Sequence, residues 1–364
     1  MAHDDDDNRR RVYLQQLYPE SQQGTDLHNI DIVLVHGVNG DPVKTWQTEP
    51  PKGGQTKPVL WPRDLLPKHF PDARVLSFGY NGDMYQNDSI AGIRDLAKSL
   101  LSYLSIKRRT ANATRPILFI AHCLGGLIVK QALHTAHYER DYKRIAEETK
   151  GVFFFGTPHL NSRQDKWDRI VESYSIINPP SRFRRRSKLV KILQRDSDAM
   201  VDLMNKFRHL MVKGNRGLSV TGEALDLRYV IVNFYETEVM KGAGGLIVDK
   251  TAAQLFVAGE IVKAAHADHV SMCRFKEDGA VFEELCHEIE KIVLVEEVGG
   301  QQPQSQNVDW SGTDRFGRRV RIEGKVTVES NGSAGTGRVQ ELPGVAGPKL
   351  VGYQMESRAE EVNA

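Results

Sequence analysis

One segment of the sequence places a cysteine where a nucleophile would be exposed. In ILFIAHCLGGLIVKQAL, an apolar run leads to Cys123, and an apolar helical pattern follows, with Gly125 and Gly126 just after the cysteine. A tight turn between a buried strand and a helix presents the nucleophile in one large class of acyl-transfer enzymes. Serine is the usual residue at that turn. The question is therefore whether the chain also supplies partners that would activate Cys123.

Two later segments supply a candidate base and candidate acids. In enzymes with a nucleophile on such a turn, the acid and then the histidine follow along the chain. His269, in HADHVSMCRF, follows the last apolar run and is the candidate base. Glu236, in VNFYETEV, ends the preceding run, whereas Asp249, in GGLIVDKTAA, lies further on. We expect Glu236 to be the acid because it lies at the strand end itself, with Asp249 as the alternative.

Two backbone amides are candidates for an oxyanion hole. Leu124 begins the helix after the nucleophile, where amides are unpaired and the helix dipole favours negative charge. Val38 follows the end of the first core strand, where this kind of site takes its second donor. A thiol with a pKa of about 8.5, placed beside an imidazole and a helix N-terminus, would hold more of its thiolate form. These residues predict acyl transfer by a triad of Cys123, His269 and Glu236.

Three other histidines are expected to have supporting roles. His122 is interpreted as a positioning residue and not as a base, since neighbouring residues of a strand point to opposite faces. His36 is expected to support the oxyanion loop, and His159, in GTPH, to lie at the rim of the site. The alternative to catalysis is that cysteine in place of serine marks a catalytically silent domain kept for binding.

Apolar runs alternate with helical patterns over most of the chain. Helices are predicted over residues 89–109, with Ser89 as the cap, and over residues 124–137. The apolar runs are too uniform for strands with one exposed face, and they indicate an α/β fold with a mainly parallel central sheet and helices on both faces. A ligand site in such a sheet lies at the carboxyl ends of the strands. Strands are predicted at residues 32–35, 74–80, 117–121, 152–155, 229–234 and 261–265.

The alternation of strands and helices sets the expected domain boundaries. Residues 1–28 are polar and are expected to be disordered or loosely attached, and residues 29–297 form the catalytic domain. Residues 162–228 are long for a connection between strands and are expected to form a helical cap over the site. Residues 298–364 are rich in Gly, Ser and Gln, so we expect little stable packing there.

Composition excludes several classes of partner and cofactor. Forty-nine Lys and Arg against 47 Asp and Glu give a formal net charge of +2, which predicts no nucleic-acid partner. The three cysteines lack paired spacing, so neither disulfides nor a zinc site is expected. No phosphate-binding or dinucleotide motif occurs, and we expect neither a metal nor an organic cofactor. Without a signal peptide or a membrane span in the sequence, we expect a soluble cytoplasmic protein.

A basic segment could direct the protein to a membrane surface. Arg182 to Lys188 carries four arginines and one lysine around Phe183. We expect a solvated basic turn, and the alternative is that the segment binds anionic lipid headgroups.

Seven motifs together resemble a known family. In order, they are DIVLVHGVNGDPVKTW, LWPRDLLPKHFPDARVLSFGY, ILFIAHCLGGLIVKQAL, GVFFFGTPH, FYETE, LIVDKTAAQL and HADHVSMCRF. They resemble the α/β-hydrolase domains of the serine-esterase group, which includes serine-active-site-containing proteins and lipase-like domains of fungal NACHT and ankyrin-repeat proteins. The resemblance covers residues 12–295 and implies a hydrolase of carboxylic or lipid esters. It implies nucleophile Cys123, where most members have serine, base His269, and acid Glu236 or Asp249.

The C-terminal tail suggests a second class of function. Stand-alone proteins that resemble this domain can carry short C-terminal motifs through which a receptor triggers assembly and programmed cell death in fungi. Here RVRIEGKVTVE, residues 319–329, alternates apolar and polar residues, and Asn331-Gly332 follows as a turn signal. The tail is thus a candidate site for a signalling partner, although its composition favours disorder.

Overall fold

The structure is a computed structural model of the whole chain, which divides into two units, residues 1–293 and 294–364. It describes residues 12–20, 29–50, 57–82, 92–109, 113–159, 197–211, 228–277, 279–300, 305–313, 319–327 and 354–361.

The larger unit is built on a sheet in which the described residues form seven strands, in the order β1-β3-β2-β4-β5-β6-β7. β1 pairs antiparallel with β3, and the other neighbouring strands are parallel. All six predicted strands are confirmed, with small shifts of their ends. The strands are β1 (Tyr13–Tyr18), β2 (Ile30–Val35), β3 (Ala73–Gly79), β4 (Ile117–His122), β5 (Thr149–Phe155), β6 (Val230–Glu236) and β7 (Ile261–Ala265).

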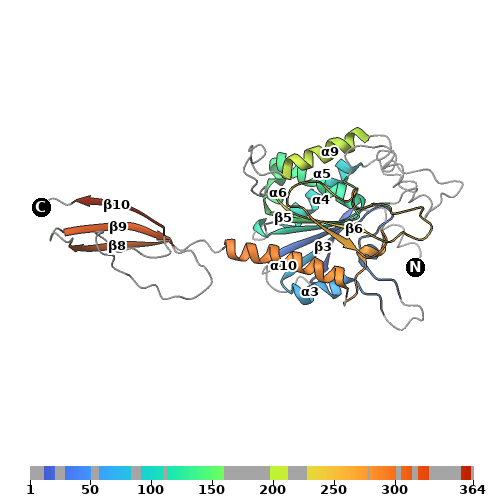
Figure 1. Cartoon of the computed structure of the whole chain (residues 1–364), viewed down its shortest axis with the longest axis horizontal. Helices are drawn as coiled ribbons and strands as arrows, with labels where there is room; N and C mark the ends of the chain where they lie inside the picture. Colours follow the sequence, from blue (N-terminus) through green and yellow to red (C-terminus); the bar gives the residue numbers. More distant parts are fainter. Residues whose placement is uncertain are drawn as a thin grey trace. The chain divides into compact units, whose positions relative to one another are not determined.

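Helices cover both faces of this sheet (Figure 1). One face is covered by α4 (Ile93–Lys107), α5 (Leu124–Tyr138), α6 (Lys143–Glu148) and α9 (Ser197–Met211). The other is covered by η1 (Lys44–Trp46), α2 (Trp61–Asp64), α3 (Leu66–His69) and α10 (Ala280–Gly300). Two short 3-10 helices, η3 (Arg140–Tyr142) and η4 (Ser271–Cys273), lie in connections.

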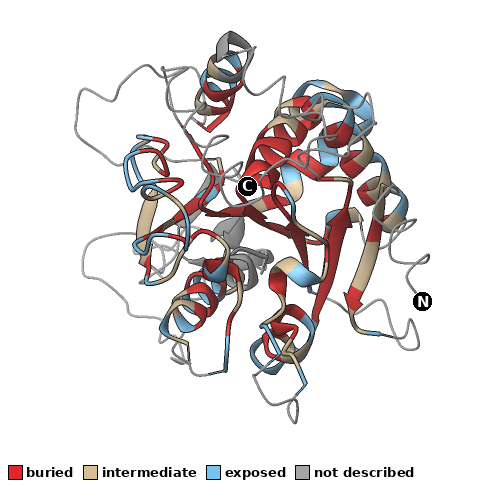
Figure 2. Ribbon diagram, turned by 90° about the vertical axis from the view of Figure 1, so that its right-hand side faces the viewer, coloured by how far each residue is buried: buried red, intermediate tan, exposed pale blue. Residues whose placement is uncertain are grey.

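The strands are apolar on both faces because both faces are buried. Every residue of β2 and β4 is buried, and the sheet is the buried centre of this unit in Figure 2. Val33 and Val35 pack with the residues of α4 and α5, whereas Ile32 and Leu34 pack with those of α2 and α10. The mainly parallel sheet with helices on both faces is therefore confirmed.

Three parallel strands end at the residues singled out by the sequence. Cys123 follows β4, Glu236 is the last residue of β6, and His269 follows β7. A nucleophile on the turn after a central strand, followed along the chain by the acid and the histidine, is the arrangement of the α/β-hydrolase fold. The chain has this fold.

The expected cap, residues 162–228, is described in part, at α9. This helix packs against α5, and its Met204 and Phe207 are fully buried. Because α9 lies between the parallel neighbours β5 and β6 along the chain, it is a crossover helix on the face of the sheet and not a lid. Ser89 and the basic segment Arg182 to Lys188 lie outside the described residues.

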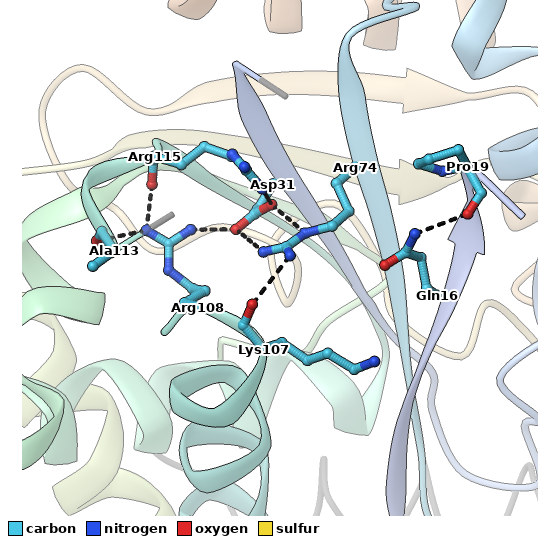
Figure 3. A network of polar contacts seen from close by, with 8 residues as sticks. All are labelled: Gln16, Pro19, Asp31, Arg74, Lys107, Arg108, Ala113 and Arg115. Carbon is cyan, nitrogen blue, oxygen red and sulfur yellow. Dashed lines mark hydrogen bonds and ion pairs between the residues drawn. The ribbon is translucent and has the colours of Figure 1, made fainter. Parts of the chain in front are cut away.

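A buried ion cluster lies at the amino-terminal ends of the parallel strands, opposite the strand ends just listed (Figure 3). Asp31, in β2, receives Nε and Nη2 of Arg74 at 2.8 Å and Nη1 of Arg115 at 2.9 Å. Nη1 of Arg108, at the end of α4, contacts the same carboxylate. Arg74 and Arg108 also donate to the backbone oxygens of Lys107 and Ala113, respectively. This single carboxylate joins β2, β3, the end of α4 and the start of β4.

One expectation about the ends of the chain is corrected, and the other stays a prediction. Residues 1–28 are not wholly without structure, because Tyr13–Tyr18 form β1, which buries Leu14 and Leu17. The smaller unit contains an antiparallel sheet of β8 (Ser305–Thr313), β9 (Arg319–Thr327) and β10 (Gln354–Glu361), with β9 in the middle. These residues thus have regular backbone structure, whereas the prediction of little stable packing after residue 298 stays a prediction.

Among the helices that the structure describes, none has both the length and the apolar composition required to cross a membrane.

Candidate active site

Cys123 lies on a sharp turn between β4 and α5, in a strained backbone conformation. Its φ of 49° and ψ of −118° lie outside the regions that L-residues favour. Such a conformation costs on the order of 1–3 kcal/mol and persists where its surroundings hold it. Here the Cys123 amide donates to Phe155 O at 2.9 Å. The Cys123 carbonyl accepts from Gly126 N and from Thr157 Oγ1, both at 3.1 Å.

Glycines around the turn allow neighbouring segments to approach it. A Cβ at Gly125 would lie 2.2 Å from Val35 O, so the first turn of α5 is pressed against the end of β2. A Cβ at Gly37 would lie 2.7 Å from Cys123 Cβ, so the loop after β2 reaches the side chain of Cys123. Both contacts require a residue without a side chain.

His269 is held between Cys123 and Glu236. Its Nδ1–H donates to Glu236 Oε2 at 2.7 Å, and the side chains of this pair are 0% and 1% exposed. The other carboxylate oxygen, Oε1, accepts the amide of Val248 at 2.8 Å. The imidazole also interacts with Cys123, which contributes to the raised pKa of His269. Because Nδ1 is directed to the carboxylate, Nε2 is the nitrogen available to the thiol.

These contacts set the charge of His269. Burial alone would lower the pKa of His269, but its interaction with Cys123 and its hydrogen bond to Glu236, together with the negative charges of both groups, raise this pKa from 6.5 to about 10. A histidine that holds its proton this firmly beside a thiol favours an imidazolium and a thiolate. The thiolate is the nucleophilic form of cysteine.

The structure separates the two candidate acids. Asp249 is exposed, and its Oδ1 accepts the amide of Ala252 at 2.7 Å. It therefore stabilises a local turn, whereas Glu236 is buried against His269. Glu236 is the carboxylate that the fold brings to the imidazole.

Leu124 and the residue before Val38 both lie beside Cys123. Leu124 is the first residue of α5, so its amide has no partner within the helix. Val38 directly follows Gly37, the residue whose α-carbon faces the Cys123 side chain. The assignment of these two amides as oxyanion donors stays a prediction, with one amide in the turn and the other in the loop after β2.

His122 connects the strand of the nucleophile to the loop of the histidine. Its Nε2–H donates to His269 O at 2.9 Å, and the two ring centroids are 4.8 Å apart. Burial and the charge of His269 hold the pKa of His122 well below 6.5, so this ring is neutral. The contact fits the predicted positioning role of His122.

His36 supports the loop after β2, as expected. Its ring stacks on Tyr80 with centroids 4.1 Å apart, and its Nδ1 lies 3.0 Å from Gly37 O. Tyr80 Oη donates to His36 O at 2.7 Å. Burial lowers the pKa of His36 to about 4, although its hydrogen bond to Gly37 opposes this effect.

His159 is not at the rim of the site, because it is 1% exposed. It belongs to a buried polar chain that starts at Lys130 Nζ, which contacts His159 Nδ1. His159 Nε2–H donates to Asn233 Oδ1 at 2.9 Å, and Asn233 Nδ2 donates to Glu260 Oε2 at 2.8 Å. Burial and the charge of Arg208 hold the pKa of Lys130 well below 10.5. A lysine inside the apolar pattern LIVKQAL is the sequence signal for this chain.

Thr157 is the residue at the nucleophile that sequence reasoning missed. It is 1% exposed and follows β5 in the segment GTPH, which draws attention to its histidine instead.

In the part of the chain that the structure describes, no three His, Cys, Asp or Glu side chains are grouped so that they could hold a metal ion.

Comparison with known proteins identifies a family and several relatives. The family model described as "Putative serine esterase (DUF676)" matches residues 30–218. Protein SERAC1 of Danio rerio is 26% identical over 280 residues, which cover 72% of this chain and 38% of that protein. Protein SERAC1 of Homo sapiens is 26% identical over 267 residues, which cover 69% and 37%. The chain therefore spans less than two fifths of the length of these relatives.

Solved structures similar to this chain include two hydrolases. A carboxylesterase of Nitrososphaera gargenis aligns with a TM-score of 0.46 and 11% identity, covering 78% of this chain and 96% of that one. The peroxisomal α/β-hydrolase Lpx1 of Saccharomyces cerevisiae aligns with a TM-score of 0.44 and 10% identity, covering 76% and 79%. The assignment of the fold rests on the sheet and on the turn at Cys123, and not on these alignments.

Proposed function

Because the chain belongs to the family described as "Putative serine esterase (DUF676)", we propose that it is an esterase-like hydrolase in which Cys123 replaces the serine nucleophile. The substrates are carboxylic esters, including those of lipids. The observation that carries this proposal is the buried hydrogen bond between His269 and Glu236, joined to Cys123 on its strained turn. These are the three roles that nucleophilic acyl transfer requires.

The first half of the reaction transfers the acyl group to sulfur. The Cys123 thiolate attacks the ester carbonyl carbon, a C–S bond forms, and the carbonyl oxygen becomes an oxyanion. The amides of Leu124 and Val38 donate hydrogen bonds to this oxygen. When the oxyanion collapses, the C–O bond to the alcohol breaks, and His269 gives its proton to the leaving oxygen. The products are a thioester on Cys123 and a free alcohol.

The second half releases the acyl group to water. The neutral His269 takes a proton from a water molecule, and the resulting hydroxide attacks the thioester carbonyl. The second oxyanion collapses with cleavage of the C–S bond, which returns the thiolate beside the imidazolium. Glu236 stays ionised throughout and stabilises the positive charge of His269.

The test is the formation of an acyl-enzyme on Cys123. We expect a burst of alcohol release from p-nitrophenyl acetate, with an acetyl adduct on Cys123 detected by intact-mass and peptide analysis. Cys123→Ala and His269→Ala should lose both the burst and the adduct. Cys123→Ser should keep ester hydrolysis, since a histidine and an acid can also activate a hydroxyl.

Two other cysteines provide an internal control. Burial raises the pKa of Cys273 well above its usual value and that of Cys286 to about 12. Iodoacetamide at neutral pH should therefore modify Cys123 and leave Cys273 and Cys286 unmodified. Hydrolysis that does not depend on Cys123, with no adduct, would leave the silent binding domain as the function to pursue.

A further inference from the structure

We propose that Thr157 is a positioning residue that aims the Leu124 oxyanion donor through the carbonyl of Cys123. The proposal rests on the hydrolase function stated above. Thr157 lies just after β5 and is 1% exposed, and its Oγ1–H donates to Cys123 O at 3.1 Å.

The geometry of the peptide bond connects this contact to the oxyanion hole. The carbonyl of Cys123 and the amide of Leu124 belong to one planar trans peptide unit, in which C=O and N–H point in opposite directions. Holding the oxygen on one side of the plane therefore fixes the direction of the N–H on the other side. The threonine hydroxyl thus acts on the donor without touching a substrate.

The end of β5 holds the turn at two points. Phe155 O accepts the amide of Cys123 at 2.9 Å, while Thr157 reaches the carbonyl of the same residue. Gly126 N also donates to this carbonyl, at 3.1 Å, but that bond lies within the turn and moves with it. Thr157 is the contact that ties the carbonyl to a separate strand. A strained residue such as Cys123 depends on an external contact of this kind.

The absence of a side chain at Gly126 leaves room for Thr157. A Cβ at Gly126 would lie 2.2 Å from Thr157 Oγ1 and 2.4 Å from Thr157 Cγ2. No side chain fits in that space, so the first turn of α5 packs directly on the threonine. The second glycine of CLGG and the threonine of GTPH are therefore one structural pair, formed by segments about 30 residues apart.

The test compares Thr157→Val with Thr157→Ser. Valine keeps the shape of threonine but lacks the hydroxyl, whereas serine keeps the hydroxyl. Thr157→Val should lower kcat for ester hydrolysis about tenfold with KM unchanged within about twofold, because the lost hydrogen bond acts on the transition state. Thr157→Ser should restore kcat to within about threefold of the wild type.

The threonine at the start of β5 provides the matched control. Thr149 is 2% exposed, and its hydroxyl donates to Ile145 O at 2.7 Å, at the opposite end of the strand. Thr149→Val removes the same kind of bond far from the nucleophile, so it should change the unfolding transition but not kcat. Equal kcat in Thr157→Val and Thr149→Val, with an active wild type, would overturn the role of Thr157 and leave the proposed function intact.

Two reagents distinguish positioning of the donor from distortion of the thiol. Iodoacetamide alkylates Cys123 without forming an oxyanion, so its rate should stay within about threefold in Thr157→Val. A simple alkyl aldehyde such as hexanal forms a hemithioacetal with the thiol, and the oxygen of this adduct occupies the oxyanion hole. The affinity for hexanal should therefore fall about tenfold in Thr157→Val. If the wild type binds hexanal but does not hydrolyse esters, this affinity still tests Thr157. An aldehyde affinity unchanged by Thr157→Val, or a wild-type Cys123 that reacts with neither reagent, would refute the proposal.

Discussion

Glu236→Gln is the substitution that tests the site most sharply, because the structure fixes how the new amide would lie. In the native protein, Oε1 of Glu236 accepts the Val248 amide at 2.8 Å, and Oε2 accepts His269 Nδ1–H at 2.7 Å. A glutamine has one oxygen and one NH₂ group. The oxygen must face Val248, since an NH₂ group there would oppose an N–H. The NH₂ group is then directed at His269 Nδ1.

This orientation places the imidazole in the wrong tautomer. With a donor facing it, Nδ1 becomes an acceptor, and the proton moves to Nε2, the nitrogen that should exchange protons at Cys123. The wrong histidine tautomer costs about 10⁴-fold in kcat in a serine triad. A thiol needs less help from its base than a hydroxyl, so we expect a loss of about 10³-fold, equivalent to about 4 kcal/mol in the activation barrier.

The assay is kcat for p-nitrophenyl acetate in the wild type, Glu236→Gln and Asp249→Asn. The asparagine keeps the oxygen that accepts the Ala252 amide, so Asp249→Asn should retain kcat within about twofold. Retention of more than about a tenth of kcat in Glu236→Gln would refute the tautomer argument. A large loss in Asp249→Asn would instead identify Asp249 as the acid.

The same variant has an expected pH signature. The negative charge of Glu236 contributes to raising the pKa of His269 to about 10, so the wild-type imidazolium is present below that pH and is lost as the pH rises through it. Removing the charge lowers the pKa of His269. In acylation by an alkyl ester, the leaving alkoxide takes the proton of His269, so this step requires the imidazolium. The alkaline limit of acylation should therefore move to lower pH in Glu236→Gln, as measured by the pH dependence of kcat/KM for an alkyl ester.

Two further predictions concern stability. Asp31→Asn leaves Arg74, Arg108 and Arg115 buried without their carboxylate, so it should lower the free energy of unfolding by about 3–5 kcal/mol in urea titrations. Asp202→Asn breaks only the exposed pair with Lys206 and should lower it by at most about 1 kcal/mol. Equal losses in the two variants would contradict the assigned role of the cluster. Burial lowers the pKa of Lys130 in the folded protein, so the unfolded chain binds the additional proton. Wild-type stability therefore rises by at most about 1.4 kcal/mol per pH unit as the pH increases toward about 10, the pKa of lysine in the unfolded chain. Lys130→Met removes this contribution, and parallel pH dependences of unfolding in the two proteins would show that Lys130 is protonated in the folded state.

Local pattern was enough to predict the main elements of the sheet. The runs DIVLVHG and ILFIAHC are apolar at every position because both faces of β2 and β4 are buried, and that property is visible in the sequence. The turn at Cys123 was predicted for the same reason, since a buried strand, two glycines and an apolar helix adjoin one another. By contrast, the short edge strand Tyr13–Tyr18 lies in a polar segment, and its pairing with β3 depends on residues about 60 positions away.

The positions of polar side chains depended on tertiary contacts. From the sequence, His159 was expected to be a loop histidine at the rim of the site. In the structure it is buried between Lys130 of α5 and Asn233 of β6. The helix expected to cap the site became a crossover because its apolar residues pack on α5, and the sequence shows that such a stripe exists but not which surface it meets.

The sequence by itself identified the candidate nucleophile, the candidate base and the strand ends that carry them, because the strands and the turn are recognised from contiguous residues. The choice between Glu236 and Asp249 was decided by the tertiary structure alone. The path of the loop after β6 brings the Val248 amide back to Glu236 and leaves Asp249 in solvent. The hold of Thr157 on Cys123 has the same origin, since a hydrogen bond of 3.1 Å between two strand ends exists only once the sheet has formed.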